Sequence, residues 1–160
     1  MKYLIYIMFL FFCSGCASPY IPKTEKELRE NPYQIMEVCS QLPLKKAFNI
    51  IVVNTIRCHA GQEEDGILMP AGGVFLPITT SSETNVYHEI SDDLEDAKVS
   101  IEFKSSTNGG FLQLIEIRKT GACPASISIY KLNESKKWKT ASEAVFKWLE
   151  GDTETCFESF

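Results

Sequence analysis

Three segments in the second half of the chain alternate apolar and polar side chains, and this alternation constrains the fold more than any other feature. They are AKVSIEFKS (97–105), FLQLIEIRK (111–119) and ASISIYKL (125–132). Consecutive side chains of a strand point to opposite faces, so each segment would have one apolar and one polar face. STNGG and TGACP are turn-forming sequences between them. Together they predict an antiparallel sheet whose apolar face must be covered by helices.

The first covering helix is predicted within QLPLKKAFNIIVVNTIRCHAG (41–61). Apolar residues recur there at helical spacing between Leu44 and Ile56, Pro43 suits a first-turn position, and Gly61 suits a C-terminal cap. The β-branched run NIIVV favours a strand instead. Both interpretations stay open, and the helix is preferred.

A second helix is predicted near the C-terminus. Thr140 and Glu143 have capping-box spacing, and Gly151 would end the helix. Its apolar stripe consists of Ala144, Val145, Trp148 and Leu149.

The complete element order predicts an α+β domain at residues 33–160. A strand at 33–40 precedes the first helix, GILMPAGGVFLPITT (66–80) reads as an irregular strand or two short ones, and NVYHEI (85–90) as another short strand. We therefore expect an antiparallel sheet of four to five strands packed on one face by two helices. The 160 residues, 44% hydrophobic and 23% charged, suit one globular domain.

The N-terminus reads as a processing signal. Lys2 is followed by the uncharged run YLIYIMFLFF (3–12), which is shorter than the roughly 20 residues needed to span a bilayer. CSGC (13–16) has the spacing of a thiol redox motif, but it ends this run and is followed by Ala17, Ser18 and Pro19. A redox role is therefore disfavoured.

Ser14-Gly15-Cys16 resembles the lipobox of bacterial lipoproteins, with Cys13 where Leu is usual. The resemblance implies that residues 1–15 are removed and that Cys16 carries a diacylglyceryl thioether and an acylated amine, the palmitate-type anchor of an envelope lipoprotein. By the sorting rule of such proteins, Ala17 implies the outer membrane. The alternative is an ordinary cleaved signal with a fortuitous Cys16. Residues 16–32 would then form a flexible tether, in which TEKELRE could make one or two helical turns before Pro32.

Two further resemblances concern the folded part. The tail WLEGDTETC and the segment RCHAG are similar to the ends of small uncharacterised proteobacterial lipoproteins. The element order is similar to that of helix-grip, START-like lipid-binding domains, in which a curved sheet wraps a C-terminal helix. That likeness is one of element order alone.

Four cysteines remain after processing, namely Cys39, Cys58, Cys123 and Cys156. An even number beyond the inner membrane predicts two disulfides, because zinc ligands usually occur in close pairs and these four do not. If the first strand lies antiparallel beside the last, Cys39 meets Cys123, which leaves Cys58 to pair with Cys156. Each bridge would close a loop of roughly 80–100 residues.

No catalytic motif, cofactor site or metal site is found in the sequence. The two histidines, His59 and His88, lie outside recognisable motifs, and the acidic runs at Glu63–Asp65 and Asp92–Asp96 read as solvated turns, with weak calcium binding as the alternative. Trp138 and Trp148 read as packing residues. Lys136, Lys137 and Lys139 form the only basic cluster in a chain of net charge −5, which argues against a nucleic-acid partner.

The sequence thus favours a non-enzymatic envelope lipoprotein that acts through protein or envelope contacts. The alternative is a carrier for a lipid or another apolar ligand, with a pocket lined by Phe75, Phe103, Phe111, Phe146 and Trp148. A third hypothesis, a hydrolase, requires a nucleophile and a base in one cleft. The membrane, through Cys16, is the only partner that the sequence indicates.

Overall fold

The structure is a computed structural model that describes residues 20–71 and 74–156, with side chains described outside 63–80. Its elements in chain order are α2 (Glu25–Glu30), β1 (Gln34–Ser40), α3 (Leu44–His59), β2 (Gly61–Ala71), β3 (Val74–Ile90), β4 (Asp96–Ser105), β5 (Gly109–Arg118), β6 (Ala125–Lys131) and α4 (Lys136–Glu150). The α+β class is therefore confirmed. Within this part of the chain, no helix is long and apolar enough to cross a membrane.

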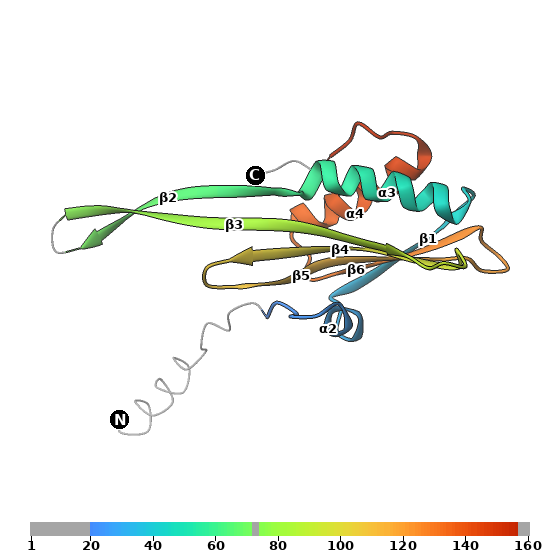
Figure 1. Cartoon of the computed structure of the whole chain (residues 1–160), viewed down its shortest axis with the longest axis horizontal. Helices are drawn as coiled ribbons and strands as arrows, with labels where there is room; N and C mark the ends of the chain where they lie inside the picture. Colours follow the sequence, from blue (N-terminus) through green and yellow to red (C-terminus); the bar gives the residue numbers. More distant parts are fainter. Residues whose placement is uncertain (1–19, 72–73, 157–160) are drawn as a thin grey trace, which may run out of the picture.

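The six strands form one open antiparallel sheet in the order β1-β6-β5-β4-β3-β2 (Figure 1). The expected count of four to five strands is too low. Residues 61–71 pair along their whole length with β3, although Gly66 was expected to begin the strand pattern. NVYHEI (85–90) is not a separate short strand, because β3 continues without interruption from Val74 to Ile90 and includes it.

Helices α3 and α4 lie side by side on one face of the sheet, here called the helical face (Figure 1). Strand β6 shows the resulting alternation, because Ala125, Ile127 and Ile129 are fully buried between partly exposed neighbours. The residues of α3 and α4 that complete the core include Phe48, Ile51, Val145 and Trp148. Each large apolar side chain buried there stabilises the fold by about 1.5–3 kcal/mol.

Residues 44–59 form a helix in spite of their β-branched run. Leu44, Phe48 and Ile51 recur on one side and are buried against the sheet, so packing outweighs the local strand preference. The predicted C-terminal cap is wrong: Ala60 is the C-cap residue, in an extended conformation, and Gly61 already begins β2.

The C-terminal helix begins earlier than predicted. Ser135 is its N-cap and accepts a hydrogen bond from the Trp138 N–H, so the expected capping box at Thr140 and Glu143 does not form. Thr140 lies within the helix and donates its hydroxyl hydrogen to the Lys136 carbonyl oxygen at 2.9 Å. The predicted end is confirmed, because Gly151 adopts a left-handed conformation with φ of 105°.

The third described helix, α2, lies on the opposite side of the sheet, here called the α2 face (Figure 1). The Thr24 side chain caps α2, and Leu28 is fully buried. The Phe111 N–H also donates to the Pro22 carbonyl oxygen at 2.8 Å. Residues 20–32 are therefore packed on the sheet, which differs from the expected tether and places the start of the ordered domain before residue 33. The predicted helical turns in TEKELRE are present.

Both predicted disulfides are present, Cys39–Cys123 and Cys58–Cys156, with Cα atoms 5.5 Å apart in each. The Cys39–Cys123 bond follows from the strand register, because β1 lies beside β6 and Cys39 is paired with Ser126, close to Cys123. The two bonds span 84 and 98 residues of sequence.

Candidate functional site

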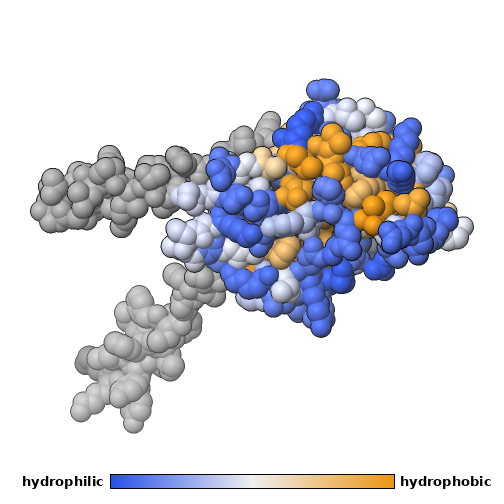
Figure 2. Space-filling view, in the orientation of Figure 1, coloured by the Kyte–Doolittle hydropathy of each residue, from blue (hydrophilic) through white to orange (hydrophobic). Residues whose placement is uncertain are grey.

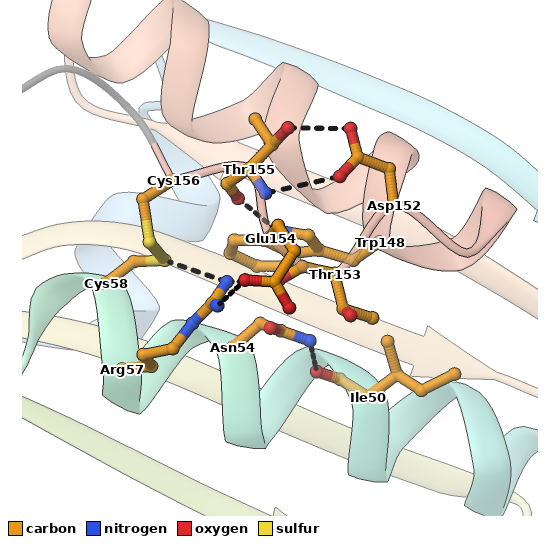
Figure 3. The surroundings of a disulfide bond; sticks show 10 residues. All are labelled: Ile50, Asn54, Arg57, Cys58, Trp148, Asp152, Thr153, Glu154, Thr155 and Cys156. Carbon is orange, nitrogen blue, oxygen red and sulfur yellow. Dashed lines mark hydrogen bonds and ion pairs between the residues drawn. A yellow bond between two sulfur atoms is a disulfide. The ribbon is translucent and has the colours of Figure 1, made fainter.

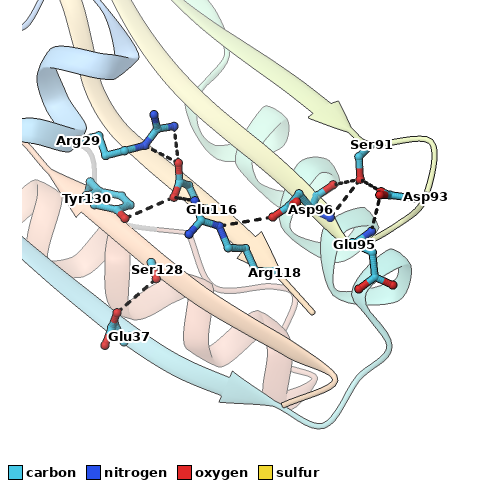
Figure 4. A network of polar contacts seen from close by, with 10 residues as sticks. All are labelled: Arg29, Glu37, Ser91, Asp93, Glu95, Asp96, Glu116, Arg118, Ser128 and Tyr130. Atoms are coloured by element: carbon cyan, nitrogen blue, oxygen red, sulfur yellow. Dashed lines mark hydrogen bonds and ion pairs between the residues drawn. The ribbon is translucent and has the colours of Figure 1, made fainter. Parts of the chain in front are cut away.

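Glu116 is the central charged residue of the α2 face (Figure 4). Its side chain is only 7% exposed, and its carboxylate accepts hydrogen bonds from Arg29 Nε at 2.6 Å, from an Arg118 guanidinium nitrogen at 3.1 Å and from the Tyr130 hydroxyl at 3.3 Å. A buried carboxylate requires such partners. Burial, together with the charge of Glu116, raises the pKa of Tyr130. The network fastens α2, through Arg29, to β5 and β6.

A second carboxylate of α2 makes the same kind of contact with β4. Glu25 accepts hydrogen bonds from Lys98 Nζ at 2.8 Å and from the Ser100 hydroxyl at 2.7 Å. Burial by itself would raise the pKa of Glu25, but these hydrogen bonds and the nearby positive charges hold the pKa below its usual value. The hydrogen bond with Glu25 raises the pKa of Lys98. Two carboxylate contacts therefore fix the position of α2.

An open hollow of about 300 Å³ lies beside this network. Its lining contains three cationic residues, Arg29, Lys98 and Arg118, and three acidic residues, Glu89, Asp96 and Glu116. Lys98 pairs with Glu89 and Arg118 pairs with Asp96, so the cations already have carboxylate partners. The hollow has no excess of either charge that would select an ionic ligand.

The N-terminal segment joins the body at the β4–β5 turn. Lys23 Nζ donates to Asn108 Oδ1 at 3.1 Å and to the Gly109 carbonyl oxygen at 2.5 Å. Next to it the Pro22 carbonyl oxygen lies against Gly110. These contacts fix where the chain that leads back to Cys16 leaves the folded body.

The β2–β3 hairpin extends beyond the rest of the sheet at the same end (Figure 1). The last pair between β3 and β4 is Ser82↔Ser105, whereas β2 and β3 stay paired as far as Ala71↔Val74. We call the eight further pairs, residues 64–71 and 74–81, the overhang. At about 3.4 Å per residue they project roughly 27 Å past the end of β4.

A separate apolar surface lies on α3, where Figure 2 shows exposed hydrophobic side chains gathered together. Val53 is 64% exposed and Ile56 is 41% exposed. They lie on the side of the helix that faces away from the sheet, opposite the buried Ile51. Large apolar side chains grouped on a surface often mark a contact with another molecule.

The two histidines both lie on the helical face, but their surroundings differ. The His59 ring is stacked on Trp138, with centroids 5.6 Å apart and an interplanar angle of 6°. Burial and the nearby Lys137 charge lower the pKa of His59 to about 3, so this imidazole is neutral at physiological pH. His88 is exposed and its ring meets Phe48 edge to face at 6.1 Å. Trp138 and Trp148 are both buried packing residues, as predicted.

The acidic runs are placed differently from each other. Asp92–Asp96 forms the predicted turn, in which Asp93 accepts hydrogen bonds from the Ser91 hydroxyl at 2.6 Å and from the Glu95 N–H (Figure 4). Glu63–Asp65, however, lies within strand β2 and not in the expected loop. No group of three or more His, Cys, Asp or Glu side chains suited to a metal ion occurs among the described residues.

The residues expected to line an apolar pocket do not meet in one place. A bulge in β5 pairs Gln113 with Ile101 and then Phe111 with Glu102, so Phe111 lies on the α2 face, where it lines a charged hollow with Glu25. Trp148 lies on the opposite side of the sheet in the core.

The other three residues that were expected to line the pocket do not form one either. Phe146 also packs against the core under the helices, Phe103 is partly exposed, and the side chain of Phe75 lies outside the described residues.

The Cys58–Cys156 disulfide closes the C-terminal segment over Trp148 (Figure 3). The Trp148 Nε1–H donates to the Thr155 carbonyl oxygen at 2.6 Å, and Arg57 donates to the Thr153 carbonyl oxygen. Asp152 accepts hydrogen bonds from the Thr155 hydroxyl and N–H. This end of the domain is thus closed by covalent and polar contacts together.

Neither the Glu116 network nor the overhang was expected from the sequence. Glu116 sits at a polar position of an alternating strand, where nothing in the sequence indicates burial by α2. The uncharged run ILMPAGGVFLPI (67–78) was the available signal for the overhang, but its prolines and glycines suggested interruption. Cys13 and Cys16, with the predicted signal peptide, lie outside the described residues.

Comparison of the chain with protein-family models, with curated proteins and with solved structures finds no match in any of the three.

Proposed function

We propose that this protein is a membrane-anchored envelope lipoprotein that acts through protein or envelope contacts and not by catalysis. In this proposal residues 1–15 are removed, Cys16 is lipidated, and Ala17 directs the mature protein to the outer membrane. The domain, fastened by two disulfides, suits an oxidising compartment. No cofactor and no nucleic acid take part.

The observation that carries the proposal is the packing of the N-terminal segment on the sheet. Tyr20 is the first described residue, and its hydroxyl donates to Glu27 of α2 at 2.9 Å. It follows Cys16 by four positions, and an extended chain covers at most about 3.5 Å per position. A lipid on Cys16 would therefore hold the domain within about 14 Å of the membrane and would limit its orientations.

The apolar surface on α3 supports the contact role. A charged helix surface would keep the domain apart from neighbours, whereas Val53 and Ile56 offer apolar area to another molecule. Site-specific photo-crosslinking from position 53 in cells should give adducts that the same probe at the exposed Lys45 does not give. Equal labelling from both positions would remove this surface from the proposal.

The test of the anchor compares the full-length protein with its Cys16→Ser variant. The intact mass of the protein from membranes should show acyl groups on the residue 16 sulfur and amine, with the loss of residues 1–15. The variant should leave the membrane fraction while keeping its fold, as shown by unchanged disulfides. Wild-type protein without acyl mass, or a variant that stays in the membrane, would overturn the proposal.

The strand order also suggests a helix-grip-like plan, which we propose at the level of topology. Support comes from β6, which lies beside β1 although a helix and four strands intervene in the chain, and from α4, which follows β6 and packs on the same sheet. We do not extend this likeness to a carrier function, because Phe111 and Trp148 lie on opposite faces and the hollow that Phe111 lines is open and charged.

A further inference from the structure

We propose that the outer part of the overhang inserts into the same bilayer leaflet that carries the lipid on Cys16. This inference rests on the proposed lipidation and names a second point of attachment. It is carried by the juxtaposition of an apolar hairpin end and the N-terminal attachment at one end of the sheet.

The register of the hairpin separates polar and apolar residues by distance from the body. The inner three pairs, from Glu64↔Ser81 to Gly66↔Thr79, contain acidic residues, serine and threonine. The outer five pairs, from Ile67↔Ile78 to Ala71↔Val74, contain only apolar residues. The change from polar to apolar residues occurs at the same pair in both strands, so the overhang has an apolar end and a polar base.

An apolar end of this kind cannot be covered by its own sheet. Neighbouring positions of a strand belong to opposite faces, so two paired strands with five consecutive apolar residues each have apolar positions on both faces. A hairpin that covers a core has one polar face instead. The outer pairs must therefore be surrounded on both sides when they are withdrawn from water, and a lipid leaflet does this.

The positions of two prolines favour lipid over an added protein strand. Pro70 lies in β2, at the edge of the sheet, and Pro77 lies in the part of β3 that has no β4 partner. Neither has an N–H, so a strand laid along either edge would lack hydrogen-bond donors there. Open strand edges are not tolerated deep in the hydrocarbon, so we place the hairpin end where the headgroups meet the acyl chains, within reach of water.

The dimensions of the two attachments agree. The overhang reaches roughly 27 Å beyond the end of β4, and its outer five pairs account for about 17 Å of that length. Cys16 can lie at most about 14 Å from Tyr20, which is held near the same end of the sheet. With Cys16 at the membrane surface, the apolar end would therefore reach the boundary between the headgroups and the acyl chains of that leaflet.

The test uses the full-length, lipidated protein in vesicles of phosphatidylethanolamine and phosphatidylglycerol. An environment-sensitive nitrobenzoxadiazole (NBD) probe is attached at Phe75→Cys, and in a matched protein at Ser81→Cys, an exposed position at the polar base of the same strand. We expect the probe at position 75 to shift to the blue, to lose most of its quenching by aqueous iodide and to be quenched by lipids with spin-labelled acyl chains. The probe at position 81 should stay accessible to iodide.

A second pair of variants distinguishes insertion of the hairpin from nonspecific adsorption to the vesicles. Leu76→Asp, in the protein labelled at position 75, should restore iodide quenching, whereas Val53→Asp on the exposed surface of α3 should not. Both proteins should remain on the vesicles, because the lipid on Cys16 is sufficient for attachment.

Three results would overturn the inference, and they can be told apart. A probe at position 75 that stays accessible to iodide in acylated protein excludes insertion but leaves the anchor intact. A probe shielded from iodide but not quenched by labelled lipids indicates a protein contact, such as a second copy. A protein without acyl mass on Cys16 removes the proposed function, and the shared leaflet with it.

Discussion

Pro22 lies directly against Gly110, so that a Cβ atom at Gly110 would overlap the Pro22 carbonyl oxygen. Gly110 has φ of 147°, a conformation that side chains rarely adopt, and the next residue, Phe111, donates its N–H to the same carbonyl oxygen at 2.8 Å. A glycine in β5 therefore allows the N-terminal segment to approach the sheet.

Replacing this glycine should release the N-terminal segment. We expect Gly110→Ala to weaken the packing of residues 20–30 by about 1–3 kcal/mol, because the new methyl group meets backbone and the conformation is strained. Hydrogen exchange should show faster exchange of the α2 amides, while α4 stays protected. Gly121→Ala is the matched control, since nothing lies within 4 Å of the added Cβ. Equal exchange in both variants would contradict the prediction.

The elements best predicted from the sequence are those in which local pattern and tertiary packing agree. The alternation of β4 and β6 indicated both the strand positions and the buried face, since Val99, Ile127 and Ile129 pack in the core under the helices. In β5 it indicated the strand only, because Gln113 to Ile117 are all buried. The Cys39–Cys123 disulfide followed from the expectation that the first strand lies antiparallel beside the last, and Cys58–Cys156 was the pair that remained. Gly151 ended α4 as expected, because only a residue tolerant of positive φ suits that position.

The elements that were missed depend on contacts between distant segments. Arg29 and Glu116 are 87 residues apart, and neither local sequence indicates the other. The capping box at Thr140 was plausible, but Ser135 begins the helix earlier and brings Trp138 over Ile101. The overhang was obscured because prolines suggested broken strands, whereas an unpaired edge tolerates them.

The contact between Glu25 and Lys98 should make the packing of α2 depend on pH. The folded-state pKa of Glu25 lies below 4.5, the ordinary value of a glutamate carboxyl, so the folded protein binds fewer protons than the unfolded chain in this range. The stability contributed by Glu25 is therefore present above pH 4.5 and lost as pH falls through the lower folded-state value. Lys98 behaves oppositely: its contribution is complete below pH 10.5 and is lost above its raised pKa.

Glu25→Gln should reduce this dependence, because the amide still accepts from Ser100 but carries no charge. The measurement is the hydrogen exchange of the Leu28 amide, whose N–H donates to the Thr24 carbonyl oxygen, at acid pH relative to neutral pH. Glu30→Gln is the control, since Glu30 makes only an exposed pair with Lys26 at 3.8 Å. A pH dependence that is equal in both variants would exclude the role of Glu25.

Arg29 should stabilise the domain because it is a partner of a buried carboxylate. We expect Arg29→Ala to lower the free energy of unfolding by about 1–3 kcal/mol, since Glu116 would keep its burial but lose two hydrogen-bonding nitrogens. Urea denaturation of the single variants and of Arg29→Ala with Glu116→Leu gives the coupling energy. Lys26→Ala, on the exposed side of α2, should change stability by less than about 0.5 kcal/mol. A coupling energy near zero would show that the pair does not fasten α2.

The two disulfides should stabilise the fold by similar free energies, but only one of them should affect the segment over Trp148. Their sequence separations of 84 and 98 residues predict about 4–5 kcal/mol each from the restriction of the unfolded chain. The Cys58→Ser and Cys156→Ser double variant should also loosen the segment over Trp148, which is 1% exposed. Tryptophan fluorescence should shift to the red there and remain unchanged in the Cys39→Ser and Cys123→Ser variant. The same shift in both variants would indicate global loosening instead.

The neutral imidazole of His59 should lower stability in mildly acidic solution. Its pKa of about 3 in the folded state lies below 6.5, the ordinary value of a histidine, so between these values the unfolded chain takes up a proton that the folded protein does not. The free energy of unfolding should fall as pH drops below 6.5, by at most about 1.4 kcal/mol per pH unit. Urea denaturation between pH 7 and pH 5 measures this slope before the carboxylates titrate. His59→Phe keeps an aromatic ring against Trp138 and should flatten the slope, whereas His88→Phe, at the exposed histidine, should preserve it. If both variants keep the wild-type slope, His59 gains a proton in the folded state as readily as in the unfolded chain, and its burial against Trp138 does not control its charge.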